Sequence, residues 1–372
     1  MEVMLKKWCE VLTIVSGKNQ KTVVSTDGRF PIYGSGGIIG YASSYLCEAG
    51  TTIIGRKGTI NKPIYVNQKF WNIDTAFGIS PGKRLDSKYL YFFCCSFNLQ
   101  ALDKSTTIPS LSKKDLIQIQ MTVPSLEEQK RIVAKIEELF STLDASVAEL
   151  QTAKEKLKVY RQAVLFRAFQ NLADTITMHQ IADMIDPQPS HRTPPEVING
   201  IPYIGVGDID YSVRKVKFGE ARKVSPAVLQ EHLERYTLHK GDFIMGKIGT
   251  IGKPFIVPLP QDYTLSANVI LIQPDSEKII PEFLYWQFSS PLVTQQLTTG
   301  AAATSQPAFG IKKARLLSIK MCSVEQQRQI VSEIEGALSI CDSIQQTIDT
   351  SLQQAEALRQ SILKQAFEGT LV

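Results

Sequence analysis

The sequence has little of the residues that build cross-linked or metal-centred proteins, with six cysteines and four histidines in 372 residues. Two of the cysteines, Cys94 and Cys95, are adjacent, and six in so long a chain do not form a disulfide framework. We therefore expect reduced thiols in a protein core. The histidines show no metal-ligand spacing with cysteine or with one another, which gives no support to a metal site.

Long apolar runs are also missing. No stretch approaches the roughly 18 uninterrupted apolar residues that a membrane span requires. The opening MEVMLKKWCEVL lacks the apolar segment of a signal peptide. With 43% hydrophobic and 21% charged residues, the chain has the composition of a globular protein, and it is long enough for two domains. We expect a cytoplasmic protein.

The chain contains no persuasive catalytic motif. GRKGTIN lacks the spacing of a Walker loop, and GSGGIIG does not match GxGxxG. YIGVGDID faintly resembles the cofactor loop of an adenine methyltransferase, but that enzyme also needs a Pro-Pro-aromatic motif, to which DPQP is the nearest approach. We therefore predict no catalytic residue, no metal ligand and no cofactor bound by this chain.

The charge is distributed unevenly along the chain. The net charge of +5 divides into +7 over residues 1–124, +1 over 125–170, +1 over 171–320 and −4 over 321–372. A basic first segment is compatible with a polyanionic partner, although a solvated surface gives a similar count.

A tandem duplication organises the sequence. SLEEQKRIVAKIEELF at 125–140 returns as SVEQQRQIVSEIEGAL at 323–338, an offset of 198 residues, and the alignment needs no gap from 109 to 169. Upstream, IIGRKGTINKPIYV at 53–66 matches IMGKIGTIGKPFIV at 244–257, an offset of 191. The chain is thus a pseudo-dimer rather than a short-period solenoid.

Each repeat contains a long helix. Ser125 and Ser323 open capping-box patterns, and Asn171 and Gly369 occupy equivalent C-cap positions. Apolar residues then step by three and four over several heptads, which predicts a coiled-coil seam. The first series is Ile132, Ile136, Leu139, Leu143, Ser146, Leu150, Ala153, Leu157, Tyr160 and Val164; the second is Ile330, Ile334, Ala337, Cys341, Ile344, Ile348, Ser351, Ala355, Leu358 and Ile362. We expect the two helices to pair within the chain; packing on separate globular units, or homodimerisation, are the alternatives.

The segments before the helices have short β-rich runs, turn signals and amphipathic helical stretches. The sequence therefore predicts an α+β fold with two mixed α/β domains and two long helices. The predicted boundaries are 1–124 and 172–322 for the domains, and 125–171 and 323–372 for the helices.

Two kinds of loop could bind an anion. GRKGTINK and GKIGTIGK combine cations, unencumbered backbone N–H groups and a threonine hydroxyl, the groups that hold phosphate oxygens. DPQPSHRTPP, 186–195, is a stiff loop bearing His191 and Arg192, and arginine is the favoured bidentate reader of guanine. Solvated β-turns and a structural proline-rich crossing are the alternatives.

The whole arrangement resembles the specificity subunit of type I restriction–modification systems. The resemblance covers essentially the full length, and SLEEQKRIV at the start of the spacer helix, FPIYGSGG at 30–37 and DPQPSHRTPP at 186–195 carry it. It implies two target-recognition domains that each read half of a bipartite double-stranded DNA site. It also implies antiparallel spacer helices, central and C-terminal, in a pseudo-twofold arrangement.

The resemblance further implies partners. Two adenine-N6 methyltransferase subunits that use S-adenosylmethionine would dock on the chain, around 162–169 and 360–367. A motor-nuclease restriction subunit that uses ATP and Mg would join them. A coiled-coil scaffold without DNA and a stand-alone DNA-modifying enzyme are the alternatives from other classes. The candidate DNA-binding residues are Ser35, Arg56, Lys57, Thr59, Lys62, Thr106, Thr107, His191, Arg192, Lys247, Thr250, Lys253, Ser305 and Gln306.

Overall fold

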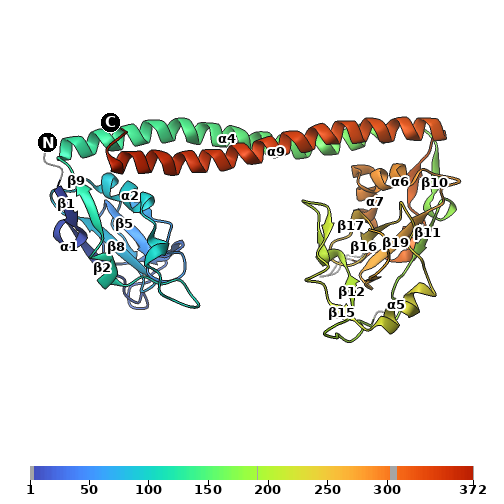
Figure 1. Cartoon of the computed structure of the whole chain (residues 1–372), viewed down its shortest axis with the longest axis horizontal. Helices are drawn as coiled ribbons and strands as arrows, with labels where there is room; N and C mark the ends of the chain where they lie inside the picture. The colour runs from blue at the N-terminus through green and yellow to red at the C-terminus, as the bar shows by residue number, and fades with distance from the viewer. Residues whose placement is uncertain (1–3, 191, 302–307, 372) are drawn as a thin grey trace. The chain divides into compact units, whose positions relative to one another are not determined.

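The computed structural model describes residues 4–190, 192–301 and 308–371 (Figure 1). Its contacts divide the chain into two compact units. The first consists of Met1–Thr152 with Ile348–Val372, and the second of Ala153–Thr347. Each long helix therefore contributes one half to each unit, whereas the predicted boundaries separated both helices from the globular domains.

The first unit is built on a four-stranded sheet and a three-stranded sheet. The first has the order β2 (Leu12–Ser16), β8 (Ala76–Pro81), β5 (Thr51–Gly55) and β6 (Ile64–Val66). The second has the order β4 (Gly37–Ala42), β3 (Phe30–Gly34) and β7 (Trp71–Asn72). The remaining elements are β1 (Met4–Lys7), α1 (Trp8–Val11), α2 (Ser87–Ser96), η1 (Leu99–Leu102), α3 (Lys113–Leu116) and β9 (Gln120–Val123), with β1 pairing with β9.

The second unit repeats this plan. Its four-stranded sheet has the order β11 (Ala182–Ile185), β19 (Val269–Pro274), β16 (Phe243–Gly246) and β17 (Gly252–Ile256). Its three-stranded sheet has the order β15 (Lys223–Val224), β12 (Ile201–Ile204) and β18 (Thr264–Leu265). The other strands are β10 (Thr175–Thr177), β13 (Ile209–Asp210), β14 (Lys215–Val216) and β20 (Ser318–Lys320), and the helices are η2 (Met178–Gln180), η3 (Val206–Asp208), α5 (Pro226–Leu233), α6 (Pro281–Phe288), α7 (Pro291–Gly300) and α8 (Ile311–Ala314).

The two units share strand order and strand direction. In each four-stranded sheet all pairings are antiparallel. In each three-stranded sheet one pairing is parallel, β3 with β7 and β12 with β18. Because two sheets with the same mixed directions occur in the same chain order, the duplication seen in the sequence extends to the fold of the globular parts.

The long helices are α4 (Leu126–Gln170) and α9 (Val324–Glu368), 45 residues each. Their predicted start signals are present: Ser125 Oγ accepts from Glu128 N at 3.2 Å, and Ser323 Oγ accepts from Gln326 N at 3.3 Å. At the end of α9, Gly369 has the left-handed φ of +78° that suits a C-cap glycine.

Within each unit the helix segments run antiparallel. In the first unit Ile136 belongs to the same buried cluster as Ile362, and Asp144 pairs with Arg359. Residues further along α4 therefore meet residues earlier in α9, which is the pattern of antiparallel helices. In the second unit Leu165 clusters with Leu338, and Arg161 pairs with Asp342 at 2.6 Å. The two ion pairs are equivalents, because each residue is displaced by 198 from its counterpart. Heptad spacing alone could not have distinguished antiparallel from parallel pairing.

The seam differs from the predicted one at five positions, Ser146, Ala153 and Tyr160 in α4 and Ile344 and Leu358 in α9, which are exposed. The predicted seam residues Tyr160, Ile344 and Leu358 are 54%, 44% and 51% exposed. The residues that follow these five positions are partly buried instead: Val147, Lys154 and Arg161 in α4, and Gln345 and Arg359 in α9. The prediction followed apolar residues, but long side chains such as arginine can pack their stems in a seam while the charged end reaches an acid.

A buried glutamine joins the start of each long helix to its own globular part. Gln129 is fully buried; its amide nitrogen donates to Arg84 O and Pro124 O, and its oxygen accepts from Asp86 N at 2.7 Å. The equivalent Gln327 is 1% exposed and accepts from Ile280 N at 2.9 Å. Both glutamines thus hold the chain just before α2 or α6 against the helix.

Among the residues described, no helix combines the length and the apolar character that crossing a membrane requires.

Candidate nucleic-acid interface

In the first unit three loops meet at the end of β5. Arg56 N and Lys57 N both donate to Thr75 O, at 2.7 and 3.2 Å. Leu111 N donates to Arg56 O at 2.9 Å, and Gly58 N donates to Pro109 O at 2.9 Å. Because the backbone groups satisfy one another, the loop is held in place without its side chains.

The side chains on this loop therefore face solvent. Arg56, Lys57, Thr59 and Lys62 are all exposed. No ion pair within the described part of the chain involves Arg56, Lys57 or Lys62. The Arg56 guanidinium lies 5.7 Å from the centroid of the Phe77 ring. Three cations without counter-ions on one loop leave a local positive potential.

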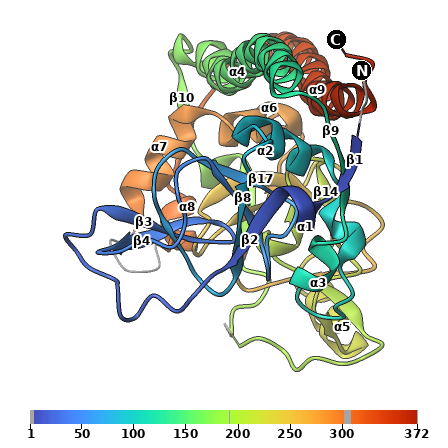
Figure 2. The same ribbon diagram turned by 90° about the vertical axis from the view of Figure 1, so that its left-hand side faces the viewer.

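The β3–β4 hairpin (Figure 2) has Ser35 in its turn, between Gly34 at the end of β3 and Gly37 at the start of β4. A Cβ added at Gly58 would stand 3.6 Å from Ser35 Oγ, so the hairpin tip and the basic loop are close neighbours. Ile38 and Ile39 follow on β4 and are 53% and 56% exposed. An exposed pair of β-branched side chains beside unpaired cations suits a surface that meets both base edges and phosphates.

The loop before α3 carries Thr106 and Thr107, both exposed. Asp103 shapes this loop, because its carboxylate accepts from Ser105 N and Ser110 N, each at 3.0 Å. The hydrogen bond from the Ser105 hydroxyl, with those from the backbone, lowers the pKa of Asp103. Lys57 bridges to Ser110, so this loop and the basic loop share a backbone connection.

The second unit repeats the backbone arrangement at the end of β16. Lys247 N donates to Asn268 O at 2.8 Å, and Phe309 N donates to Lys247 O at 2.9 Å. Ile248 bridges to Ala308 as Lys57 does to Ser110. Both loops need glycine at the strand end, since a Cβ at Gly246 would come within 1.7 Å of the Thr250 carbonyl oxygen, and one at Gly55 within 2.0 Å of the Thr59 carbonyl oxygen.

The charges on this second loop differ from those on the first. Lys247 is only 8% exposed, and its Nζ lies 2.7 Å from Asp186 Oδ2. Thr250 and Lys253 are exposed, and Lys253 Nζ lies 5.7 Å from the centroid of the Tyr211 ring. Lys247, predicted as a DNA contact, is therefore already neutralised by an acid in this structure.

Strand pairing explains the difference. Ser16 is the first-unit equivalent of Asp186, because the preceding residues, Val15 and Ile185, occupy the same place opposite β8 and β19. The first unit thus has a neutral side chain where the second has a carboxylate. This one position leaves Arg56 unpaired and gives Lys247 a counter-ion.

A hollow of about 650 Å³ opens where the loops of the second unit meet. Its floor and walls include the Lys247–Ile248 turn, the β18–β19 connection and the segment before α8. The residues that line it are Thr193, Tyr203, Gly205, Gly207, Asp208, Arg222, Lys247, Ile248, Ser266, Ala267, Asn268, Ala308, Phe309 and Gly310. Arg222 Nη1 donates to Pro194 O at 2.9 Å, which ties the proline-rich loop to the rim.

The structure places the predicted residues in two groups. Ser35, Arg56, Lys57 and Thr59 lie together in the first unit, with Thr106 and Thr107 on the adjoining loop; Lys62 is exposed at the far end of the basic loop. In the second unit Thr250, Lys253 and Arg192 are exposed. His191, Ser305 and Gln306 lie outside the described residues. Whether any of these side chains contacts DNA stays a prediction.

Several residues of these surfaces could not be recognised from the sequence, and two others were not among the predicted residues. Thr75 and Asn268 supply the carbonyl groups that hold the two basic loops, but a carbonyl leaves no mark in a side-chain pattern. Ile38 and Ile39 had a visible signal, since two isoleucines follow directly on a Gly-Ser-Gly-Gly turn. Gln188 and His232, described below, had none.

Within the described residues no group of three or more His, Cys, Asp or Glu side chains could hold a metal ion. The fold and surfaces define a class of protein: two copies of one α+β recognition unit joined by long helices, with cation-bearing loops at equivalent places.

The chain belongs to the family of type I restriction modification DNA specificity domains, whose model matches residues 2–155 and 193–354. Members of this family are non-catalytic recognition subunits. The chain is 25% identical over 349 residues to the type I restriction enzyme EcoBI specificity subunit of Escherichia coli, covering 86% of this chain and 73% of that protein. It is 21% identical to the EcoDI specificity subunit of Escherichia coli, covering 97% and 87%.

Solved structures show the same fold. A chain from a study of complex assembly and conformational transition of the type I R-M system matches with a TM-score of 0.74 at 16% identity, over 100% of both chains. The HsdS subunit from Thermoanaerobacter tengcongensis matches with a TM-score of 0.53 at 16% identity, over 99% of this chain and 97% of that one.

Proposed function

We propose that this chain reads a bipartite double-stranded DNA site, with one half recognised by each domain. The observation that carries the proposal is the duplicated loop. Arg56 and Lys247 lie on loops with the same backbone hydrogen bonds, but the side chains around them differ. Two copies of one scaffold with different surfaces suit two different half-sites, because phosphate contacts position a protein and base contacts specify sequence.

The two long helices would set the distance between the half-sites. Each has 45 residues, and at 1.5 Å per residue such a helix is about 68 Å long. A length set by the regular rise of a hydrogen-bonded helix suits a site with a constant number of unread base pairs between its halves.

The chain would act in the cytoplasm as the recognition component of a larger complex. We propose two adenine-N6 methyltransferase subunits and a motor-nuclease restriction subunit as its protein partners. The chain itself would bind no cofactor; S-adenosylmethionine would be bound by the methyltransferase subunits, and ATP and Mg by the restriction subunit. This division of labour fits a chain whose conspicuous surfaces are loops that carry exposed cations.

A selection from random duplex DNA tests the proposal. The full chain, purified with its methyltransferase partner, would be mixed with a library of random duplexes, and the bound fraction sequenced. We expect one motif with two defined blocks separated by a constant run of unspecified bases. A single continuous block, or no enrichment from a soluble complex, would contradict the proposal and favour a scaffold.

A further inference from the structure

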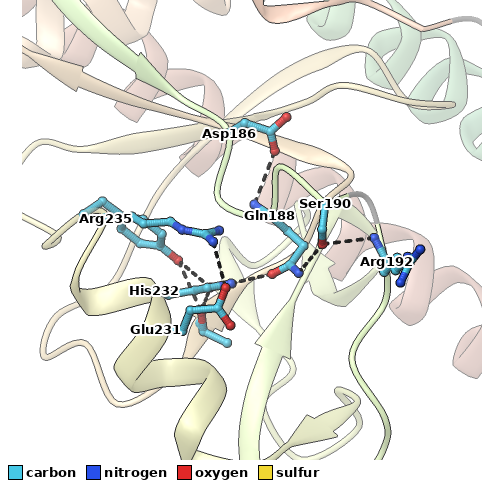
Figure 3. A network of polar contacts seen from close by, with 9 residues as sticks. Asp186, Gln188, Ser190, Arg192, Glu231, His232 and Arg235 are labelled. Atoms are coloured by element: carbon cyan, nitrogen blue, oxygen red, sulfur yellow. Dashed lines mark hydrogen bonds and ion pairs between the residues drawn. The ribbon is translucent and has the colours of Figure 1, made fainter.

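The proline-rich loop of the second unit, residues 186–195, is anchored to the interior of the unit by the buried side chain of Gln188. Gln188 is 7% exposed, and its amide oxygen lies 2.5 Å from His232 Nε2. Its amide nitrogen donates to Ser190 Oγ at 2.8 Å. Ser190 Oγ in turn accepts a hydrogen bond from Arg192 N at 3.4 Å (Figure 3). A continuous chain of polar contacts therefore leads from α5 to the backbone of Arg192.

His232 holds the lower end of this chain. It is fully buried, and its Nδ1 faces Thr264 Oγ1 and, at 3.3 Å, the Tyr236 hydroxyl. An amide oxygen only accepts, so His232 Nε2 carries the proton and Nδ1 accepts from a hydroxyl. Burial lowers the pKa of His232, which keeps the imidazole in this neutral form. Every polar atom of the ring thus has a partner.

Asp186 fixes the other end of the turn. Its Oδ1 accepts from Gln188 N at 3.3 Å while its Oδ2 pairs with Lys247. Arg192 itself is exposed, and the next residue, Thr193, lines the hollow where the loops of this unit meet. The first unit has Lys18 at the place of Gln188, and Lys18 is exposed, so this anchor belongs to the second unit alone.

We propose that Gln188 is a positioning residue for Arg192, and that recognition of the second half-site depends on it although its side chain is buried beneath the surface. The inference rests on the proposed function. Gln188 links the rigid α5 to the turn that ends at Arg192, so its loss frees the Arg192 backbone without altering the guanidinium. A bidentate contact tolerates little displacement, because both hydrogen bonds must align at once.

A double-mutant cycle tests this coupling. The complex of the full chain with its methyltransferase would be measured on duplexes in which each specified base pair of the second half-site is changed in turn. Arg192→Ala should relax one position by about tenfold. Gln188→Ala should relax that same position by a comparable factor. In the Arg192→Ala background, Gln188→Ala should add no further loss there, because residues that act through one contact are non-additive.

Gln287→Ala is the matched control. Gln287 is a buried glutamine of the same unit, 2% exposed, and its amide makes two hydrogen bonds to Lys320 away from the loop. It should lower the unfolding temperature as Gln188→Ala does, yet leave base discrimination unchanged. Gln188→Glu, which keeps the acceptor for His232, should recover part of the discrimination.

The possible results distinguish failure of the Gln188 proposal from failure of the proposed DNA recognition. A wild-type complex without any half-site preference would overturn the proposed function. Preserved discrimination in Gln188→Ala, or equal losses in both backgrounds, would overturn the inference alone. Uniform weakening on all sequences, matched by Gln287→Ala, would assign Gln188 a structural role and overturn it likewise.

Discussion

Residue 56 and residue 247 stand at the same point of a repeated loop, and their surroundings decide what each presents to solvent. Arg56 has no acid partner within the described structure, whereas Lys247 is buried beside Asp186. This contrast agrees with the net charge, +7 over the first domain and +1 over the second. We expect the first domain to supply more of the phosphate affinity.

Lys62→Ala should weaken binding to every DNA sequence alike. Lys62 is exposed, so its cation is available to release a counter-ion from a phosphate. The slope of log K against log salt should fall by about one unit. Titration at several salt concentrations measures it, with Lys278→Ala as control because Lys278 is paired with Asp275. An unchanged slope in Lys62→Ala would remove Lys62 from the interface.

The second unit should lose stability when His232 is forced to take up a proton. Burial is the main cause of its lowered pKa; Arg235 lowers it further and Glu231 opposes both. A group whose folded pKa lies below its ordinary 6.5 stabilises the fold fully above about pH 6.5, and this stability is lost as the pH falls below that value. Unfolding temperatures between pH 7.5 and 5 should fall more steeply for the wild type than for His232→Gln. Parallel curves would contradict this.

Residue identities revealed part of the candidate surface. The exposed side chains of the basic loops follow from composition, since cations and threonine between glycines seldom lie in a core. The burial of Lys247 does not follow, because its partner Asp186 is 61 residues away and only strand pairing brings the two together. Gln188 was likewise hidden, since a glutamine between two prolines gives no indication of a histidine beneath it.

The helices were the most predictable elements. The predicted 125–171 and 323–372 compare with Leu126–Gln170 and Val324–Glu368, because capping and heptad signals are local. The seam was less predictable. Arg161 and Arg359 take seam positions that the apolar pattern gave to Tyr160 and Leu358. The two arginines are favoured there because each pairs with an aspartate on the other helix.

Arg359→Glu should destabilise the first unit modestly. Arg359 pairs with Asp144, whose side chain is 62% exposed, and its guanidinium lies 4.3 Å from the centroid of the Phe140 ring. A half-exposed pair contributes up to about 1 kcal/mol. The reversed pair, Arg359→Glu with Asp144→Arg, should recover stability in denaturant unfolding. An additive double variant would mean that the two charges do not interact.

Gln129→Met should lower the free energy of unfolding of the first unit by more than a glutamine-to-methionine change at the surface does. The methionine fills a similar volume but leaves Asp86 N and Arg84 O without their buried partner. Unsatisfied buried groups cost about 1–3 kcal/mol. Denaturant unfolding of the first unit measures the loss, and Gln162→Met on the exposed side of α4 should change it little. Equal effects of the two substitutions would argue against a role for Gln129 in holding the segment before α2 against the helix.

For the whole molecule, duplication accounts for the shared backbone scaffold of the two units but not for the side chains that distinguish their loops. Strand order, loop backbones, the cross-helix ion pairs and the buried glutamines recur in both units. The position held by Ser16 or Asp186, and the anchor of Gln188, do not recur. A common scaffold with diverged loops is the arrangement expected of two readers for two unlike half-sites.

Methylation mapping tests that claim most directly. A methylation-free host would express this chain with the methyltransferase subunit encoded beside it, and long-read sequencing would locate N6-methyladenine. The account predicts one split motif that disappears when this chain is omitted, and that loses definition in only one half when Arg192 is changed to alanine. Methylation without a split motif, or none from a confirmed soluble complex, would contradict it.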